Sequence, residues 1–567
     1  MKNLVKLPFA VVLGSAFLAS CGAGNNSSAS KTTTITPATS VSVASDSVTG
    51  DFSIVTDDGA YAQDGNVYTL SSAGTYTLSG HLDGMIYVTA GDEDDVEIVL
   101  NDASINYAEN SPIFIASANE VKIKAKNGTS NFVTDGRAEQ TTEDDSQGPG
   151  AIYAKADLKL VGQGSLTVTG TYNNGVHTSK DLKIKNLTLT SIAPNNAIKG
   201  NDSISIESGT ITAISTAGDA IKTSSTDLSS SSKQRGSVEI SGGSLSLYAG
   251  GDGIDAAYDV TIYDGVSEDD PTVSTVPSVA IYTNKYSTYS DNSVLSVADL
   301  DITAGFGPGG RGGAGGPGGG AVPGGDTKNT DKADGSAKGI KAANAIYLQG
   351  GVTNIHAYDD GIHANSGDVF DSGAKGVGLI EVSGGDTTVF CTDDGTHADG
   401  NLNIKGGTIT VSESHEGLEA NIINVSGGKA VAYGNDDGVN ASSQINVSGG
   451  YLFTAVSPSG DTDGIDSNGS YTQTGGVVIA CGPNNMNAAA LDADGAVRIS
   501  GGTFVSFGTL AVRPTSSLTS SSKSGSYGGK AYTLKFANGS IETATLNSSG
   551  YSGVTCYSEF GTLSSIS

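Results

Sequence analysis

Short runs of alternating apolar and polar residues, divided by glycine turns, recur over most of the chain. Thr408-Ile409-Thr410-Val411 is a typical run, and it follows the turn Gly406-Gly407. Alternation with a period of two predicts a strand, because successive side chains of a strand point to opposite faces. After the first 20 residues, no apolar pattern with the helical period is found. We therefore expect an all-β protein.

The runs belong to a repeat centred on an acidic residue, a glycine and an apolar residue. Asp394, Glu416 and Asp437 begin successive copies and are 22 and 21 residues apart. The copies are Asn174-Gly175-Val176-His177, Asn196-Ala197-Ile198-Lys199, Asp219-Ala220-Ile221-Lys222, Asp252-Gly253-Ile254-Asp255, Lys338-Gly339-Ile340-Lys341, Asp360-Gly361-Ile362-His363, Asp394-Gly395-Thr396-His397, Glu416-Gly417-Leu418-Glu419, Asp437-Gly438-Val439-Asn440 and Asp463-Gly464-Ile465-Asp466. Gly-Gly pairs keep step with them, at 242–243, 350–351, 384–385, 406–407, 427–428, 449–450, 475–476 and 501–502.

A repeat of about 22 residues with three short strands and three turns has the geometry of a parallel β-helix. Each coil stacks on the next at the spacing of paired strands, so equivalent residues form columns along the stack. Inward-facing residues such as Ile362, Ile409 and Ile465 would then fill the core. A β-propeller is the alternative all-β array, but its repeats run to about 40 to 50 residues.

Changes in composition and pattern divide the chain into segments. We expect a signal peptide at 1–20, a Ser/Thr-rich tether at 21–48, an N-terminal β cap at 49–110, the β-helix at 111–515 and a C-terminal β cap at 516–567. Caps are expected because the strand edges of the end coils are otherwise open. Within the β-helix, we expect residues 256–304 to form an excursion, and residues 305–335 to form a disordered, Gly-rich loop with too few apolar residues to pack.

The N-terminus predicts export. Lys2 and Lys6 precede an apolar run that ends in Leu18-Ala19-Ser20-Cys21. A charged segment, a short apolar segment and a small-residue cleavage site are typical of a secretory signal, not of a membrane span. A cysteine at this point resembles the bacterial lipobox, so we expect Cys21 to be lipidated; the alternative is a plain signal peptide with an incidental cysteine. Gly22 is not the aspartate expected for retention at an inner membrane, so we expect anchoring at the outer membrane or cell surface.

The other three cysteines are predicted to be isolated thiols. Cys391 and Cys481 lie four coils apart in the repeat, or roughly 19 Å at about 4.8 Å per coil. A disulfide needs Cα atoms within about 7 Å. We expect Cys391 to point inward, and Cys556 is the third thiol.

Charge restricts the partners. The chain holds 60 Asp and Glu against 30 Lys and Arg, for a net charge of −30. Such a chain repels the phosphates of nucleic acids, which excludes them as a natural partner. Hard cations such as calcium are the expected counterions.

The repeat places polar side chains in two columns. The first column lies two residues before the apolar position of the motif, and the second lies one residue after it. Alternation puts both columns on the face opposite the core, which we expect to be solvent. Carboxylates stacked at about 4.8 Å repel one another unless a cation lies between them, and two adjacent coils can supply the oxygens that calcium needs. The predicted calcium ligands are Asp219, Asp252, Asp255, Asp360, Asp394, Glu416, Glu419, Asp437, Asp463 and Asp466. The alternative is a set of solvated turn residues.

Cations in the second column suggest contacts to a ligand. The candidate ligand-binding residues are Lys199, Lys222, Lys341, His363 and His397. Lys199 and Lys222 occupy neighbouring rungs beside Asp219, Asp252 and Asp255. A lysine beside calcium-binding carboxylates is the arrangement needed to remove the proton next to a uronate carboxylate. The alternative is a ladder of surface salt bridges, which is worth little. His363 and His397 are also expected to stack, without a zinc-type spacing.

Several ordered segments resemble a known family. They run from Ala151-Ile152-Tyr153-Ala154 through Asp157-Leu158-Lys159-Leu160, Asn196-Ala197-Ile198-Lys199-Gly200 and Gly218-Asp219-Ala220-Ile221-Lys222 to Gly251-Asp252-Gly253-Ile254-Asp255, followed by the Gly-rich insertion. Over about residues 60–510 the chain resembles the carbohydrate-binding β-helix lipoproteins, known from a cellulose- and pectate-binding member with a polysaccharide-lyase-like fold. The resemblance implies a right-handed helix, calcium and a polysaccharide ligand that is bound and not cleaved. Asn174, Asn196 and Ala197 depart from the Asp-Gly pattern of the family.

The sequence therefore predicts a calcium-dependent, carbohydrate-binding surface lipoprotein. Tyr248, Tyr433 and Tyr451 are candidates for stacking on sugar rings, since the chain has no Trp. Two alternatives stay open: a polysaccharide lyase that acts by β-elimination, and a structural or adhesive surface protein.

Overall fold

Alternating residues form strands throughout the computed structural model, which describes residues 41–138, 147–267, 272–283, 294–295, 337–485 and 488–567. Within these ranges every regular element is a strand. No helix that could cross a membrane occurs there. The expected all-β fold with parallel strands is confirmed. The signal peptide, Cys21 and the Gly-rich loop at 305–335 lie outside the described residues.

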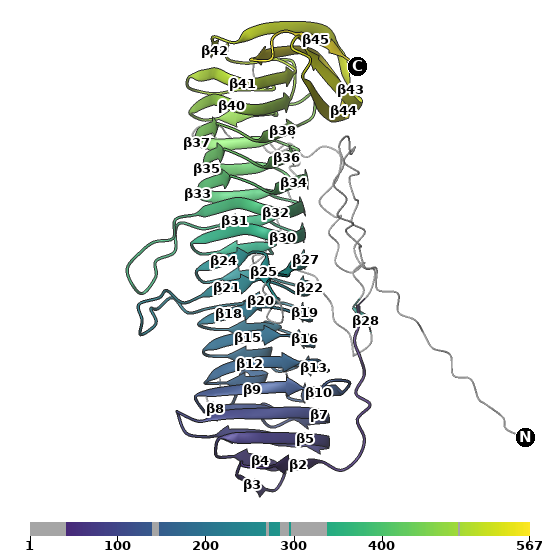
Figure 1. The fold of residues 1–567 in the computed structure, drawn as a ribbon, viewed down its shortest axis with the longest axis vertical. Helices are drawn as coiled ribbons and strands as arrows, with labels where there is room; N and C mark the ends of the chain where they lie inside the picture. The colour runs from purple at the N-terminus through teal and green to yellow at the C-terminus, as the bar shows by residue number, and fades with distance from the viewer. Residues whose placement is uncertain (1–40, 139–146, 268–271, 284–293, 296–336, 486–487) are drawn as a thin grey trace, which may run out of the picture. The chain divides into compact units, whose positions relative to one another are not determined.

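Strands one repeat apart pair in parallel and form three ladders (Figure 1). In the second ladder, for example, Leu182 pairs with Ile204, and Ile204 pairs with Val238. This stacking is compatible with the predicted β-helix.

The first ladder contains the motif strands. It comprises β4 (Val67–Leu70), β6 (Met85–Thr89), β8 (Ile113–Ser117), β11 (Gly150–Ala154), β14 (Asn174–Thr178), β17 (Ile198–Gly200), β20 (Ile221–Lys222), β23 (Ile254–Ala256), β29 (Ile340–Ala342), β31 (Ile362–Ala364), the first parts of β33 (Thr396–Ile404), β35 (Leu418–Val425) and β37 (Val439–Val447), and β39 (Asp466–Ser467).

The second ladder follows the motif strands along the chain. It comprises the first parts of β5 (Gly74–Asp83) and β7 (Asp95–Tyr107), then β9 (Glu120–Ala125), β12 (Asp157–Gly162), β15 (Asp181–Lys185), β18 (Ser203–Ile206), β21 (Ser237–Ile240), β24 (Asp259–Ile262), the first parts of β30 (Ala345–Ala357) and β32 (Leu379–Cys391), the second parts of β33, β35 and β37, the first parts of β40 (Ser470–Cys481) and β41 (Val497–Phe507), and β42 (Thr515–Ser516).

The third ladder completes each coil. It comprises the second parts of β5 and β7, then β10 (Ser130–Asp135), β13 (Ser165–Thr169), β16 (Thr188–Ala193), β19 (Thr210–Ser215), β22 (Ser244–Ala249), β27 (Ser278–Thr283), the second parts of β30 and β32, β34 (Thr408–Glu413), β36 (Lys429–Tyr433), β38 (Tyr451–Ala455), and the second parts of β40 and β41.

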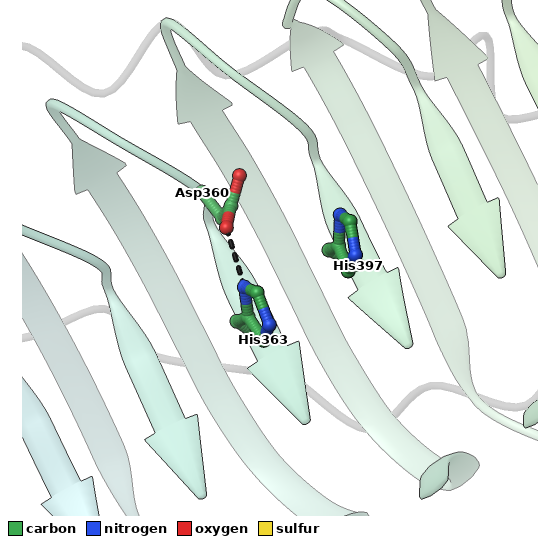
Figure 2. A group of neighbouring side chains, drawn as sticks. All are labelled: Asp360, His363 and His397. Atoms are coloured by element: carbon green, nitrogen blue, oxygen red, sulfur yellow. Dashed lines mark hydrogen bonds and ion pairs between the residues drawn. The ribbon is translucent and has the colours of Figure 1, made fainter. Parts of the chain in front are cut away.

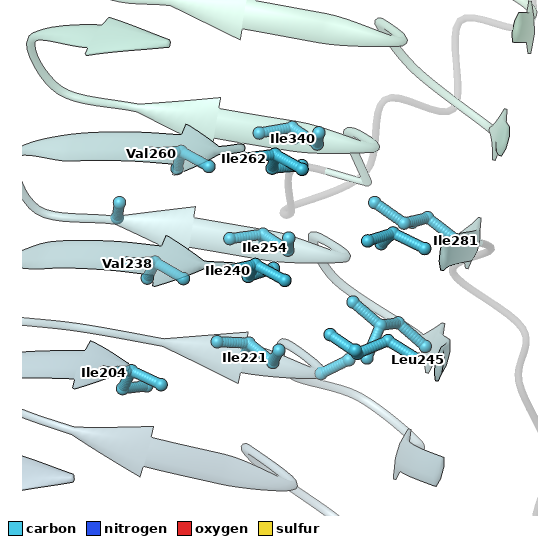
Figure 3. Packing of buried hydrophobic residues seen from close by; sticks show 14 of the residues in the cluster. Ile204, Ile221, Val238, Ile240, Leu245, Ile254, Val260, Ile262, Ile281 and Ile340 are labelled. Carbon is cyan, nitrogen blue, oxygen red and sulfur yellow. The ribbon is translucent and has the colours of Figure 1, made fainter. Parts of the chain in front are cut away.

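Apolar side chains from all three ladders meet in one continuous core (Figure 3). Ile221, Ile254 and Ile340 stack along the first ladder and are fully buried. A single coil alone would leave these apolar side chains open to water from above and below. The stacking of neighbouring coils is what removes them from water.

Each Gly-Gly pair makes a corner that only glycine fits. A Cβ on Gly406 would lie 2.4 Å from the carbonyl oxygen of Ser383 in the coil below. Gly407 has a φ of 65°, in the left-handed region. The second glycine of the other seven pairs also has a positive φ: Gly243, Gly351, Gly385, Gly428, Gly450, Gly476 and Gly502.

The ends and the excursion differ in part from expectation. Parallel pairing begins at β4, inside the segment expected to be a cap. Val67–Leu70 lacks the acidic motif that marks the later coils, so the repeat did not reveal this strand as part of the ladder. Only β2 (Ser53–Thr56) and β3 (Tyr61–Asp64) are antiparallel there. The segment 256–304 contributes β24 and β27 to the ladders; its short β25 (Gly265–Val266) and β26 (Ser274–Thr275) pair with each other, and β28 (Val294–Leu295) pairs with β1 (Val41–Ser42).

The C-terminal segment folds as antiparallel strands. β43 (Thr519–Phe536) pairs with β44 (Ile541–Ser558) and β45 (Leu563–Ile566), and β44 pairs with β41 of the last coil. These strands share a second apolar cluster with the outer face of the third ladder, around Phe453, Ile479 and Phe507.

Candidate functional site

The first polar column, called the acid column, consists of Asp219, Asp252, Asp360, Asp394, Glu416, Asp437 and Asp463. Its expected exposure to solvent is wrong for most of its length. Asp219, Asp252, Asp360 and Asp394 are only 7, 2, 3 and 8% exposed. They lie at the turn into the motif strand, where backbone groups of the next coil surround them.

Several members of the acid column hydrogen-bond one coil to the next. The backbone N–H of Asp252 donates to Oδ1 of Asp219 at 2.8 Å, and that of Asp463 donates to Oδ1 of Asp437 at 2.8 Å. Asn196 makes the same bond with the N–H of Asp219, at 3.2 Å. An asparagine side-chain oxygen can also accept this bond. The bond therefore explains why asparagine replaces aspartate in the first motif copies.

The second polar column, called the mixed column, has the register that the repeat predicts. Neighbouring coils pair its residues directly, in the order His177, Lys199, Lys222, Asp255, Lys341, His363, His397, Glu419, Asn440 and Asp466. Its side chains are half-buried, except that of His177, which is buried.

Aromatic residues extend the mixed column toward the N-terminus. Tyr87 pairs with Phe114, Phe114 with Tyr153, and Tyr153 with His177. Successive ring centroids are 5.5, 5.2 and 5.3 Å apart. Sequence reasoning missed these rings because their coils lack the Asp-Gly motif. The alternation of Ile152-Tyr153-Ala154 was the signal that could have found them.

The basic part of the mixed column contains two unlike lysines. Nζ of Lys222 donates to Oδ2 of Asp219 at 2.7 Å and to Oδ2 of Asp255 at 2.6 Å. Burial acts to lower the pKa of Lys222, but these two carboxylates outweigh it and raise the pKa. Burial and the charge of Lys222 instead lower the pKa of Lys199, and Asp219 offsets them only in part. Lys341 lies 3.5 Å from Asp252.

The central part of the mixed column is a pair of stacked histidines (Figure 2). The rings of His363 and His397 are 4.5 Å apart and nearly parallel. Nδ1 of His363 donates to Oδ2 of Asp360 at 2.6 Å. Nδ1 of His397 lies 3.0 Å from Oδ2 of Asp394 and 2.6 Å from Oε2 of Glu419. Burial opposes the charge on His397, yet these carboxylates raise its pKa to about 11.

The C-terminal part of the acid column gathers carboxylates with raised pKa values. Burial, followed by neighbouring charges, raises the pKa of Asp437 to about 8 and that of Asp463 to about 7. Burial and the nearby Glu419 raise the pKa of Glu416 to about 7. Crowded oxygen donors of this kind fit a hard cation, because its charge offsets both the burial and the repulsion.

The remaining candidates are the three tyrosines proposed to stack on sugars and the three cysteines predicted to be isolated thiols. Tyr248 is 3% exposed and stacks on Tyr282, so it cannot offer a ring to a sugar as expected. Tyr433 and Tyr451 pack against the C-terminal cluster. The described cysteines Cys391, Cys481 and Cys556 are buried free thiols, as predicted.

Comparisons with known proteins support the carbohydrate-binding part of the resemblance. A family profile described as carbohydrate-binding domain-containing protein matches residues 64–377. A relative of that description from Acetivibrio thermocellus is 38% identical over 117 residues, which are 20% of this chain and 41% of the relative. The chain thus spans less than half of that relative's length. A solved polysaccharide lyase-like protein from C. thermocellum is 36% identical, with 36% of this chain and 82% of that chain covered and a TM-score of 0.34. Because the family profile covers more than half of the 567 residues, the chain belongs to the family of carbohydrate-binding domain-containing proteins.

Proposed function

We propose that this protein is a surface lipoprotein, anchored through Cys21, that binds polysaccharide along the mixed column of a right-handed parallel β-helix. The observation that carries this proposal is the order of side chains in one register: aromatic rings at Tyr87 and Tyr153, followed by the amines of Lys199 and Lys222. A polymer with apolar sugar faces and acidic groups matches such a strip. The membrane anchor and the surface location rest on the N-terminal sequence.

The aromatic part of the column would stack on sugar faces. Tyr87 and Tyr153 are half-buried, whereas Phe114 between them is 9% exposed. The two tyrosines are two coils apart, or roughly 10 Å. This span is comparable with a disaccharide repeat of an extended glycan, so alternate sugars can meet a ring.

The basic part of the column would bind carboxylates of an acidic glycan. Lys199 is the strongest candidate, because a ligand carboxylate would offset the burial and the repulsion that lower its pKa. Lys341, His363 and His397 lie further along the same column and continue the strip.

Calcium would bind where the acid column has raised pKa values. Glu416, Asp437 and Asp463 offer oxygens on successive coils, and Asp466 adds one from the mixed column. Asp219, Asp255, Asp360 and Asp394, which we also predicted as calcium ligands, have oxygens bound to lysine or histidine. The C-terminal coils are therefore the better proposal. Bound calcium would supply positive charge to the glycan carboxylates.

The test is a pull-down of the purified protein on cellulose, polygalacturonate and mucin-type glycans, with calcium or with a chelator. We expect Tyr153→Ala to weaken binding to every bound polymer by at least about fivefold, since stacking is worth about 1 kcal/mol or more per ring. We expect Lys199→Met to weaken binding to the acidic polymer alone. Tyr61→Ala is the control, because Tyr61 is an exposed tyrosine outside the column. Failure to bind any of these polymers would refute the proposal and favour a structural or adhesive role.

A lyase is the second candidate, because Lys199 has a lowered pKa and thus yields a neutral amine more readily than an ordinary lysine. Lys222 does not qualify, since two carboxylates hold its proton. Elimination would create an unsaturated uronate that absorbs ultraviolet light. If no uronate polymer gives such a product, the lyase candidate is excluded.

A further inference from the structure

Three atoms that could bind a metal ion lie together beside the stacked histidines. His363 is on β31, and His397 occupies the same register position on β33. Asp399 follows His397 by two residues on β33, so strand alternation places both on one face. Oδ1 of Asp399 lies 4.0 Å from Nε2 of His363 and 3.5 Å from Nε2 of His397. In Figure 2 the two rings have the same orientation, with each Nε2 turned away from Asp360.

A second set of groups holds each of these side chains in place. Nδ1 of His363 is bound to Asp360, and Nδ1 of His397 to Asp394 and Glu419. The other carboxylate oxygen of Asp399 accepts hydrogen bonds from the backbone N–H of Ser366 at 2.7 Å and from its hydroxyl at 3.2 Å. Nε2 of both rings and Oδ1 of Asp399 thereby lie on the same side of the stacked pair, with Oδ1 within 4.0 Å of each Nε2.

We propose that His363, His397 and Asp399 form a binding site for a first-row divalent transition-metal ion of the zinc type. Two imidazole nitrogens and one carboxylate suit zinc and its neighbours, whereas calcium takes oxygen ligands. A histidine that binds such a metal through one nitrogen almost always donates its other N–H to a carboxylate or carbonyl group, as both rings do in this site.

The dimensions of the site suit this ion. Ligand atoms at about 2.1 Å from a tetrahedral metal lie about 3.4 Å apart. The observed 3.5 and 4.0 Å are close to this separation, and the two rings, stacked 4.5 Å apart, must tilt toward each other for both Nε2 atoms to reach one ion. The side chains of His363, His397 and Asp399 are 15, 28 and 33% exposed, so an ion can enter from solvent. Three protein ligands leave a coordination position for water or for a ligand group.

The charges around the site favour a cation. Asp360, Asp394 and Glu419 join Asp399, so four carboxyl groups surround two imidazoles. The alternative is an ion-pair network that holds protons and no metal. It uses the same contacts, because a protonated imidazole also turns its Nε2–H toward a carboxylate, and it predicts that zinc does not bind.

The experiment is a titration of the full chain with zinc chloride by calorimetry, in saturating calcium chloride so that oxygen-only sites are filled. We expect one zinc ion per chain and at least about tenfold weaker binding for His363→Gln and for His397→Gln. Asp399→Asn should weaken binding, and Asp399→Glu should restore part of it. His81→Gln is the matched control, since His81 also pairs with an aspartate, Asp83, but lies outside the column.

Unchanged zinc affinity in both histidine variants, or the absence of zinc binding to the wild-type chain, would overturn the proposal. Cobalt provides a second measurement that needs no variant. Cobalt bound through imidazole nitrogens in a four- or five-coordinate site absorbs visible light far more strongly than the hydrated ion. A spectrum like that of the hydrated ion would also overturn the proposal. Neither result bears on glycan binding, which is measured separately.

Discussion

Asp437 offers a test of whether the acid column acts through a hydrogen bond or through its charge. Its Oδ1 accepts the backbone N–H of Asp463 at 2.8 Å, while burial raises its pKa to about 8. Asp437→Asn keeps an oxygen for this bond and removes the ionisable group. Asp437→Ala removes both. Asn174 and Asn196 already use an amide at this position of the repeat.

The two variants should differ in their dependence on pH. Between its ordinary pKa of about 4 and the folded value of about 8, Asp437 keeps a proton in the fold that the unfolded chain releases. The fold binds more protons, so its stability falls as pH rises through this range. Each unit of difference between the folded and the unfolded pKa is worth about 1.4 kcal/mol of stability. For a rigid site, the loss of stability over this pH range is therefore on the order of 5 kcal/mol. Water entry and local rearrangement reduce this, and we expect Asp437→Asn to be about 2 kcal/mol more stable than wild type near pH 9 without calcium.

The loss of the hydrogen bond should be visible in Asp437→Ala at every pH. An unsatisfied amide costs about 1 to 3 kcal/mol, so the Asp463 N–H should exchange with deuterium about five- to 160-fold faster. In Asp437→Asn the Asp463 amide should exchange as slowly as in wild type, because the asparagine oxygen keeps the hydrogen bond.

Urea unfolding at about pH 5, 7 and 9 in chelator, with hydrogen exchange at the Asp463 amide, measures both effects. Equal exchange in the two variants would refute the hydrogen-bond role. If the stability of Asp437→Asn relative to wild type does not increase between about pH 5 and pH 9, the buried-charge argument is refuted. Calcium should stabilise wild type more than Asp437→Asn, and an equal effect on both would remove Asp437 from the calcium site.

Three further predictions concern other parts of the fold. Gly407→Ala should lower the free energy of unfolding by about 1 to 3 kcal/mol, because its φ of 65° is strained for alanine; a urea melt that matches wild type would contradict this. Lys222→Met should destabilise the protein by about 1 to 2 kcal/mol, since Asp219 and Asp255 lose their shared cation; an equal or higher unfolding midpoint would show that the pair is not needed. Cys391 should react with a thiol reagent only on unfolding, because burial raises its pKa and blocks access; rapid labelling of the native chain would refute its inward position.

The sequence by itself determined the strand class, the repeat and the register of the mixed column. These follow from local rules: alternation sets the face of each residue, and the repeat length sets which residues meet on adjacent coils. The neighbouring positions of Lys199 and Lys222, and of His363 and His397, were predictable for this reason. So was the separation of Cys391 from Cys481, since it depends only on counting coils.

Only the tertiary structure decided how the polar atoms are used. The direction of Oδ1 of Asp219 toward the next coil depends on the turn before the strand, which no pattern of alternation describes. Burial of the acid column follows from the same turn. The aromatic residues at the start of the mixed column lie in coils that lack the motif. Asp399, which approaches both histidines, lies just outside the motif copy that contains His397. Such contacts are set by the stacking of whole coils at a fixed spacing, and not by the residues of one coil alone.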